Sequence, residues 1–393
     1  MKKRIIALVD CDAFFVSCEQ ADNKQYKNKP VCVISGKNGC VVSRSKEAKL
    51  LGIRMGMPMF MAKKEFPNAE YIVANHEKYH EYSKKVMACL CDFSPDVQIV
   101  SIDEAYIDLT GTRKLFGRNY VNIAKLIRET IKEKTDITVS IGISLSKTLA
   151  KLASDKAKKH DGIYVIGTRK ILSELEITNI EEISGIGKAN NLTLRKYGIL
   201  TGYEFISQSD DWIRSNFGSN GVEMKHELLG EVISKVDSSP KLPKSIQSTS
   251  VIGEGIFSDD IHVLKFELAK HLHEACSRLR NNGAKCLCLG VMLKAKDFST
   301  YFDKKNLVRP VALEITLQKT VDELFDKIYR PNVLYRSTGI ILERLISADA
   351  EQLSLFADTS IKEERLSECI HSLEKKFGKN AVRTLGASGI HND

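Results

Sequence analysis

The stretch Ile5-Ile-Ala-Leu-Val-Asp-Cys-Asp-Ala-Phe-Phe15 decides the fold. Its first five residues are apolar and rich in β-branched side chains, which is typical of a buried strand. Asp10-Cys11-Asp12 follows at the carboxyl end of that strand, and a helix is expected over residues 13–22. The pattern therefore predicts a buried strand that brings carboxylates directly to the start of a helix.

A second acidic pair interrupts another apolar stretch. Residues 97–109 alternate around Asp103 and Glu104, as in a β-hairpin or two abutting strands. Adjacent carboxylates in an apolar run resist burial unless cations neutralise them, and hard divalent ions such as Mg²⁺ take oxygen ligands. Asp10, Asp103 and Glu104 are therefore candidate metal ligands. On spacing alone, a solvated hairpin tip and an ordinary strand-end carboxylate remain an open alternative.

Further elements extend outward from these two segments. A wholly helical region is expected over 170–235, and 237–244, with two prolines, is the candidate linker. The first part of the chain is expected to have strands at 5–9, 97–109, 137–143 and 163–166, helices at 13–22, 77–93, 121–134 and 147–158, and an insertion with strands at 30–35 and 40–43 and a helix at 46–51. A second β-α-β-β-α-β order is expected at 248–257, 263–279, 285–294, 311–317, 321–328 and 337–345.

Composition narrows the class of protein. The 393 residues are 43% hydrophobic and 28% charged, which favours folded domains over a disordered chain. No run of 18 apolar residues occurs, so no membrane partner is expected. The ten cysteines form no C-x-x-C pair and predict reduced thiols in a cytoplasmic protein. Lys and Arg number 59 against 50 Asp and Glu, and this net charge of +9 weakly favours an anionic partner.

Three blocks of sequence carry a family resemblance. Residues 9–19 (Val-Asp-Cys-Asp-Ala-Phe-Phe-Val-Ser-Cys-Glu), 101–108 (Ser-Ile-Asp-Glu-Ala-Tyr-Ile-Asp) and 142–153 resemble the signature blocks of Y-family (translesion) DNA polymerases. Residues 44–58 are most similar to the UmuC branch, the catalytic subunit of DNA polymerase V. The resemblance covers nearly the whole chain in family order.

The resemblance implies an α+β, multidomain, right-hand-like polymerase. It has a ferredoxin-like palm, small fingers, a helical thumb with a helix-hairpin-helix, and a β-α-β-β-α-β little finger. The implied boundaries are 1–22 and 75–168 for the palm, 23–74 for the fingers, 169–236 for the thumb, 237–244 for the linker, 245–346 for the little finger, and 347–393 for a tail.

The same resemblance assigns the chemistry. Asp10, Asp103 and Glu104 would be the catalytic metal ligands, joined by the backbone carbonyl of Cys11. Two Mg²⁺ ions, for which Mn²⁺ is an expected substitute, would assist in-line attack of a primer 3′-hydroxyl on a deoxynucleoside triphosphate. Helix residues Lys151 and Asp155 would support this site.

The family pattern also assigns a nucleotide site. Phe15 would be the steric gate that leaves no room for a 2′-hydroxyl. Many family members have Tyr and Arg where this chain has Lys46 and Lys49, and Lys lacks the planar fork of Arg. The residues expected to contact the nucleotide are Phe14, Phe15, Ser43, Arg44, Lys49 and Lys158.

Two segments imply macromolecular partners. The Gly185-Ile-Gly187-Lys188 turn resembles a helix-hairpin-helix, in which backbone N–H groups face DNA phosphates. An apolar pentapeptide in an acidic context, Gln352-Leu353-Ser-Leu355-Phe356, resembles the peptide that bacterial replication factors insert into the sliding clamp.

The expected function is error-prone, template-directed translesion synthesis on primer–template DNA during the DNA-damage (SOS) response, without proofreading. A UmuC-type enzyme further implies UmuD-like and RecA partners. Three alternatives stay open: a stand-alone polymerase IV (DinB)-like enzyme, a different palm-type enzyme such as a nucleotide cyclase, and a non-catalytic DNA- or clamp-binding scaffold.

Overall fold

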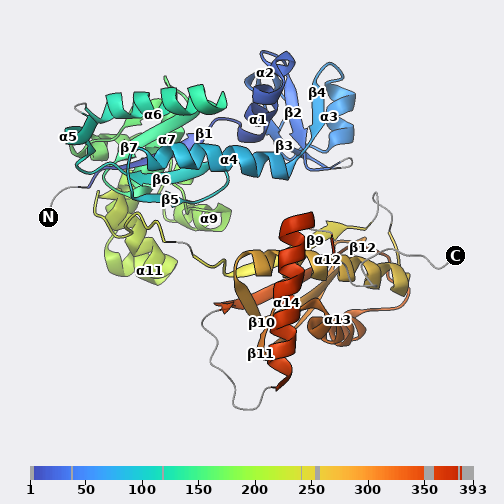
Figure 1. Cartoon of the computed structure of the whole chain (residues 1–393). Coiled ribbons are helices and arrows are strands. Elements are labelled where there is room, and N and C mark those ends of the chain that lie inside the picture. Colours follow the sequence, from blue (N-terminus) through green and yellow to red (C-terminus); the bar gives the residue numbers. More distant parts are fainter. Residues whose placement is uncertain are drawn as a thin grey trace. The chain divides into compact units, whose positions relative to one another are not determined.

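The computed structural model describes residues 4–36, 39–116, 119–239, 241–252, 257–348, 358–378 and 381–382. The chain divides into two compact units, Met1–Ser239 and Pro240–Asp393, which are taken in turn below (Figure 1). Within the described residues the strands form one sheet of five, one of four and one of three.

A five-stranded sheet organises the first unit, in the order β5-β6-β1-β7-β8. The central strand β1 pairs antiparallel with both β6 and β7, whereas β7 and β8 run parallel. The bounds are β1 (Ile6–Cys11), β5 (Val97–Ile99), β6 (Glu104–Asp108), β7 (Val139–Ser144) and β8 (Ile163–Val165). The expected strand with acids at its carboxyl end is therefore the centre of this sheet.

Helices cover both faces of this sheet. Ala7 and Val9 of β1 join the core formed with α4 and α6, while Ile6 and Leu8 pack with Ala150 of α7. Because successive strand residues point to opposite faces, Asp10 continues the face that α7 covers. The helices around this sheet are α1 (Phe14–Asp22), α4 (His76–Cys91), α5 (Thr112–Phe116), α6 (Tyr120–Thr135) and α7 (Lys147–Ala157).

A small three-stranded sheet, ordered β3-β2-β4, forms the insertion between α1 and α4. It has a core of its own, built around Cys32, Ile34 and Ile53. Its elements are β2 (Val31–Ile34), β3 (Val41–Arg44), α2 (Lys46–Leu50), α3 (Met59–Glu65) and β4 (Glu70–Val73). The sequence did not predict α3 and β4, because both are short and half exposed and so lack a strong apolar period.

The segment from 168 to 228 is helical, whereas the helical region was expected to continue to residue 235. It contains α8 (Ile171–Glu176), α9 (Lys188–Lys196), α10 (Gly202–Ile206) and α11 (Asp210–Leu228), with 3₁₀ turns at Thr168–Lys170 and Ile180–Glu182. A further 3₁₀ turn, Lys24–Tyr26, lies outside this segment, directly after α1. These helices share one core with Leu149 and Leu152 of α7. The helical region is thus packed against the helix that faces Asp10.

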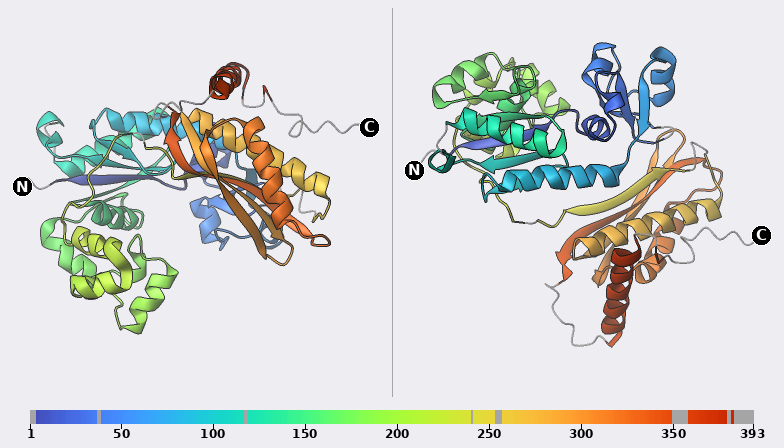
Figure 2. Two further views of the ribbon diagram at one scale, coloured as in Figure 1. Left: turned by 90° about the horizontal axis from the view of Figure 1, so that it is seen from below. Right: turned by 45° about the horizontal axis from the view of Figure 1, so that its top comes forward.

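The second unit is a four-stranded antiparallel sheet ordered β11-β10-β12-β9. Helices α12 and α13 cover one face of the sheet, and both contribute to its core (Figure 2). Its elements are β9 (Ser245–Val251), α12 (Ile261–Asn281), β10 (Ala284–Ala295), β11 (Thr300–Val311), α13 (Glu314–Ile328) and β12 (Tyr335–Ser347). The expected β-α-β-β-α-β order and the α+β class are confirmed.

One element of that prediction was wrong. Residues 311–317 were expected to form a strand, but β11 ends at Val311 and α13 begins at Glu314. The apolar residues Leu313, Leu317 and Val321 are four apart and buried, which is the period of a helix face. The true strand contains the polar run Asp-Lys-Lys-Asn, so its alternation is weak in sequence.

A C-terminal helix, α14 (Asp358–Phe377), packs on this unit. Ile370 enters the core, and Arg280 of α12 donates a 2.9 Å bond from Nη2 to Oε1 of Glu374. Both side chains of this ion pair are almost fully buried. The segment expected to bind a clamp, 352–356, lies outside the described residues. None of the described helices is long and apolar enough to cross a membrane.

Candidate active site

Asp10 and Glu104 face each other across adjacent strands. Asp10 lies near the end of β1 and Glu104 begins β6, and the two are directly paired in the antiparallel register. The Cys11 backbone N–H donates to the carbonyl of Asp103 at 2.9 Å, which fixes the loop before β6 against the end of β1. Directly opposed residues have neighbouring side chains on one face of a sheet, so the register brings the two acids together.

Two lysines of the α7 segment neutralise these acids. Lys151 Nζ lies 3.1 Å from Asp10 Oδ2 and 2.6 Å from Glu104 Oε2. Lys158 Nζ lies 2.8 Å from the same Asp10 oxygen. Burial alone would lower the pKa of Lys151, but its bond to Glu104 and the charge of Asp10 outweigh burial and raise that pKa. The two carboxylates therefore occupy a site that requires positive charge.

The third acid is held apart from this pair. Asp103 Oδ1 accepts a hydrogen bond from Ser101 Oγ. In the part of the chain that the structure describes, no three His, Cys, Asp or Glu side chains converge as metal ligands. The donor chemistry nevertheless fits Mg²⁺, because hard carboxylate oxygens of Asp10 at the end of β1 and of Glu104 at the start of β6 lie next to each other. Asp103 has to turn from Ser101 to join them.

Cys11 is suited to this site through its backbone rather than its sulfur. Its side chain is buried in the core with Val9. Burial, followed by the charges of Asp103 and Asp10, raises the pKa of the Cys11 thiol well above its usual value. A protonated thiol is a poor metal ligand, so only the carbonyl oxygen suits the expected role.

A strained turn connects β1 to α1. Ala13 has φ 45°, a left-handed conformation unusual for a residue with a side chain. Two serines hold the residue before it: Ser17 Oγ donates to the Asp12 carbonyl at 2.6 Å, and Ser140 Oγ donates to Asp12 Oδ1 at 2.7 Å. The sequence predicted no role for Asp12 or Ser140, because their contact depends on the pairing of β1 with β7.

The two phenylalanines after this turn are placed differently. Phe14 is 4% exposed and belongs to the core. Phe15 is half-buried and stacks on the ring of Tyr79, with centroids 4.5 Å apart. His76 meets Phe15 edge-on at 6.0 Å. Phe15 therefore presents a fixed ring beside the strained turn.

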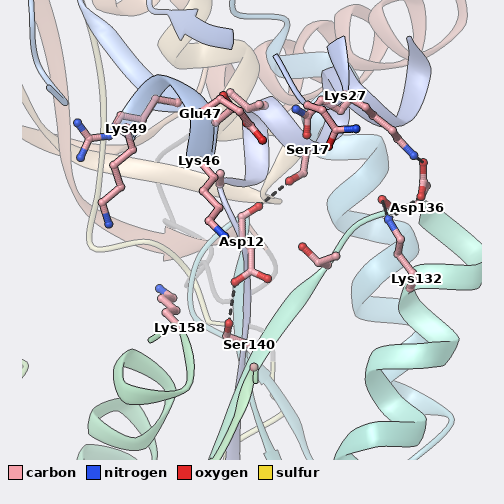
Figure 3. A pocket seen from close by; sticks show the side chains of 18 of the residues that line it. Asp12, Ser17, Lys27, Lys46, Glu47, Lys49, Lys132, Asp136, Ser140 and Lys158 are labelled. Carbon is pink, nitrogen blue, oxygen red and sulfur yellow. Dashed lines mark hydrogen bonds and ion pairs between the residues drawn. The ribbon is translucent and has the colours of Figure 1, made fainter. Parts of the chain in front are cut away.

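A cavity of about 870 Å³ opens beside this turn. Arg44, Lys46 and Lys49 from the insertion line it together with Lys158 from the end of α7. Figure 3 shows the Lys46, Lys49 and Lys158 side chains directed into the same space, with Asp12 to one side of them, next to Lys46. On the far side, Asp136 pairs with Lys27 and Lys132. Seven Lys and Arg residues line this cavity against four Asp and Glu, and this excess of positive charge suits a polyanionic ligand.

The remaining expected nucleotide residues support the wall of this cavity. Ser43 is buried, and its Oγ accepts from the Val16 backbone N–H at 3.4 Å, which links β3 to α1. The Arg44 guanidinium donates to the Ile53 carbonyl. Lys46, whose role the family pattern left in question, is exposed and lines the cavity. Its position on α2, one turn before Lys49, could have predicted that both lysines lie on the same side of the helix.

The expected DNA-binding turn lies before α9. Gly185 has φ 96°, and Gly187 is the N-cap of α9, which begins at Lys188. All three residues are exposed. The free N–H groups at the start of α9 are suited to bind a phosphate. The element before the turn, Ile180–Glu182, is a 3₁₀ turn and not the full first helix that a helix-hairpin-helix has.

Comparisons with known proteins agree with this geometry. Residues 9–155 match the impB/mucB/samB family, and residues 243–355 match the impB/mucB/samB family C-terminal domain. DNA polymerase IV of Dehalococcoides mccartyi is 31% identical, over 98% of this chain and 97% of that protein. Protein UmuC of Salmonella typhimurium is 30% identical, over 97% of this chain and 93% of that protein.

Solved structures show the same likeness. A chimeric Y-family DNA polymerase is similar with a TM-score of 0.74 and 27% identity, covering 87% of this chain and 99% of the other. An insertion ternary complex of Dbh DNA polymerase gives a TM-score of 0.61 at 26% identity with the same coverage. The likeness spans both units, and the acids Asp10, Asp103 and Glu104 fall within the first family match. The chain therefore belongs to the impB/mucB/samB family and is a Y-family translesion DNA polymerase.

Proposed function

We propose that this protein adds deoxynucleotides to a primer 3′ end by two-metal nucleotidyl transfer, with Asp10, Asp103 and Glu104 as the metal ligands. The observation that carries the proposal is the register of β1 and β6, which opposes Asp10 to Glu104 beside the cation-lined cavity. A polymerase needs these two features next to each other, because the acids hold the reacting centre and the cations hold the triphosphate.

Two bound Mg²⁺ ions would supply a lowered pKa for the primer hydroxyl and charge neutralisation at the phosphate. The carbonyl of Cys11 would complete the oxygen ligand set. Lys151, which bridges Asp10 and Glu104, holds the two carboxylates close together and oriented when no divalent ion is bound. Without that lysine, like charges this close would repel each other.

The nucleotide would lie with its phosphates among Arg44, Lys46, Lys49 and Lys158. Phe15, fixed by its stack on Tyr79, would face the sugar and exclude a 2′-hydroxyl. Phe14 and Ser43 contribute indirectly, because both are buried in the wall that supports Phe15. Binding energy thus comes from charge, and sugar selection comes from shape.

We assign the polymerase subdomains to the observed elements. The five-stranded sheet with α4, α6 and α7 is the palm, and the three-stranded sheet is the fingers. The helical segment with Gly185, Gly187 and Lys188 is the thumb, which would hold DNA phosphates. The second unit is the little finger, and 352–356 is the clamp-binding peptide.

Primer extension with Asp103→Asn and Glu104→Gln tests the proposal. Both variants should lose extension by a factor of at least 10³ in the presence of Mg²⁺, while primer–template binding stays near the wild-type level, because DNA affinity comes mainly from Lys and Arg contacts. Glu133→Gln, which changes an exposed carboxylate of α6, is the matched control and should extend normally. Extension near the wild-type rate in either acid variant would contradict the assignment.

A second question is whether the enzyme works alone. The relatives include several DNA polymerase IV proteins as well as a UmuC protein, at similar identity, while the resemblance of residues 44–58 is to the UmuC branch. A polymerase IV-like enzyme should extend primers as a purified single chain. A UmuC-type enzyme, acting in the SOS response, should be inactive until a UmuD-like subunit and RecA are added.

A further inference from the structure

The hairpin between β10 and β11 contains an unusual aromatic residue. Phe298 has φ 71°, and its side chain is 63% exposed. A bulky residue in the left-handed region costs about 1–3 kcal/mol, whereas Gly or Asn would adopt it readily. Burial does not offset this cost, because the ring is mostly in solvent. A strained and exposed aromatic side chain suggests a functional reason for its position.

A second irregularity lies on the neighbouring strand. Ala295 of β10 pairs with Tyr335, but Lys294 pairs with Ser337, so Arg336 of β12 has no opposite residue. This arrangement is a β-bulge, and bulges redirect a side chain from its regular face. Arg336 therefore leaves the alternation that the rest of β12 follows.

The strained turn and the bulge bring two side chains together. The guanidinium carbon of Arg336 lies 4.2 Å from the centre of the Phe298 ring, and Lys294 Nζ lies 5.5 Å from it. Lys296 Nζ lies 5.1 Å from the neighbouring ring of Phe257. The positive φ of Phe298 and the bulge at Arg336 are separate irregularities of the backbone, and together they place these two side chains in contact.

In the described part of the chain, the cations of this cluster have no acidic partner. Among the residues that the structure describes, Arg336, Lys294 and Lys296 form neither an ion pair nor a side-chain hydrogen bond. The nearest acid in sequence, Asp297, accepts two bonds from Ser299, at 2.9 and 2.6 Å, and so is engaged within the turn. Within the described residues, the end of β10 and the start of β12 therefore carry positive charge that no acidic side chain pairs with.

We propose that Arg336, stacked on Phe298 and flanked by Lys294, binds a phosphate of the DNA strand, and that Phe298 is a positioning residue for Arg336. This inference rests on the proposed polymerase function. A guanidinium that lies over the face of a ring can still offer N–H groups for two bonds to one phosphate. The ring also restricts a long side chain before binding, which lowers the entropy lost on association.

The occupant is a nucleic-acid backbone rather than a free anion. Between residues 241 and 345 the chain has 17 Lys and Arg against 12 Asp and Glu, so the unit as a whole attracts an extended polyanion. A single inorganic phosphate would meet only this cluster. Inorganic phosphate at matched ionic strength should therefore displace little DNA.

The test is equilibrium binding of the full chain to fluorescent primer–template DNA at a series of NaCl concentrations. Arg336→Ala should reduce the slope of log Kd against log [NaCl] by about one, because one phosphate contact is lost. Phe298→Ala removes no charge and should weaken binding about two- to fivefold, the size of a cation–π contact. In the Arg336→Ala background, Phe298→Ala should have no further effect.

Phe377→Ala is the matched control. Phe377 is also exposed, at 64%, and lies beneath Lys376 at 5.1 Å, but it is in the regular backbone of α14. Its removal should leave DNA binding unchanged. Phe298→Gly separates folding from binding, because it relieves the positive φ and should keep or raise Tm while it weakens DNA binding like Phe298→Ala.

Two results would overturn the inference. One is wild-type affinity in Phe298→Ala. The other is an equal loss from Phe298→Ala with and without Arg336, which would show that the ring acts independently of the guanidinium. Neither result contradicts the proposed polymerase function as long as the wild-type protein binds and extends DNA. A wild-type protein that neither binds nor extends DNA would contradict the polymerase function itself.

Discussion

Lys158 is the residue at which the acids and the cation-lined cavity meet. Its ammonium group contacts Asp10, and its side chain also lines the cavity. Lys158→Ala should lower kcat/KM for the incoming nucleotide about 10- to 100-fold, the usual loss when a charged hydrogen bond is removed. Steady-state kinetics of single-nucleotide insertion by the wild type and the variant gives this kcat/KM.

The neighbouring Lys159 provides the control. Its side chain is 72% exposed and pairs with Glu182 at 3.5 Å. Lys159→Ala should change kcat/KM by less than a factor of about two, as is usual for an exposed position. Similar losses in the two variants would mean that general charge, and not a specific contact, accounts for the Lys158 effect.

Phe15 should control the choice between deoxyribonucleotides and ribonucleotides. Phe15→Ala should raise ribonucleotide incorporation relative to deoxyribonucleotide incorporation about 10- to 200-fold, the range for a steric contact in a pocket. Competition between the two substrates in one extension reaction gives the ratio. Phe14→Leu is the appropriate comparison, because Phe14 is a core residue and truncation to Ala would destabilise the fold. An unchanged ratio in Phe15→Ala would remove it as the gate.

At the scale of elements, α7 depends on a glycine in β7. A Cβ on Gly142 would lie 2.0 Å from Ser154 N and 2.3 Å from the Ala150 carbonyl, both backbone atoms of α7. Gly142→Ala should therefore push α7 from the sheet and reduce the free energy of unfolding by at least about 1–3 kcal/mol. Activity should fall as well, because α7 carries Lys151.

Gly167→Ala is the control for this prediction. A Cβ there meets nothing within 4 Å, and Gly167 has φ −81°, which any residue adopts. Its effect on stability should stay within about 1 kcal/mol. Chemical denaturation of both variants gives the comparison, and equal stability of the two would show that α7 tolerates the added atom.

A buried histidine connects α12 to the edge strand β9. His271 Nδ1 lies 2.9 Å from Ser248 Oγ, and its Nε2 lies 3.2 Å from Ser250 Oγ. Burial lowers the pKa of His271, against the smaller opposing charges of Glu267 and Glu274. Because the folded protein disfavours the charged ring, its contribution to stability is complete above the unfolded pKa of about 6.5 and is lost as pH falls below it.

The lowered pKa of His271 predicts that the stability of the second unit depends on pH. The urea midpoint of the wild type should decrease between pH 7.5 and pH 5, and His271→Gln should show a smaller decrease because an amide does not titrate. The measurement is circular dichroism against urea at both pH values. The same decrease in His271→Gln would assign the pH dependence to other groups.

At the scale of the whole molecule, the expected clamp peptide can be separated from catalysis. Leu355→Ala with Phe356→Ala should reduce clamp-stimulated synthesis, because paired apolar side chains in a polar segment are typical anchors for a partner pocket. Extension without clamp should be unchanged, since tethering acts by raising the local concentration of enzyme at the primer end. Equal stimulation of the variant and the wild type by a loaded clamp would exclude the motif.

Local pattern was sufficient for much of this molecule. Residues 5–9 are apolar and end in acids, and these features located β1 and Asp10 without any knowledge of distant contacts. The order of strands and helices followed for the same reason, because hydrophobic period is a property of neighbouring residues. It failed at 311–317, where an apolar run at the start of α13 resembled a strand, and at α14, whose docking depends on Arg280 far away in the chain.

The site required contacts between segments remote in sequence. The sequence named Asp10, Glu104 and Lys158 as site residues, but only the pairing of β1 with β6 set the two acids opposite each other, and only the packing of α7 brought Lys158 to Asp10. The roles of Asp12 with Ser140 and of Phe298 with Arg336 were invisible beforehand, since each depends on strand register, a bulge or a positive φ. Such features arise from the balance of packing over the whole fold, and no local pattern encodes them.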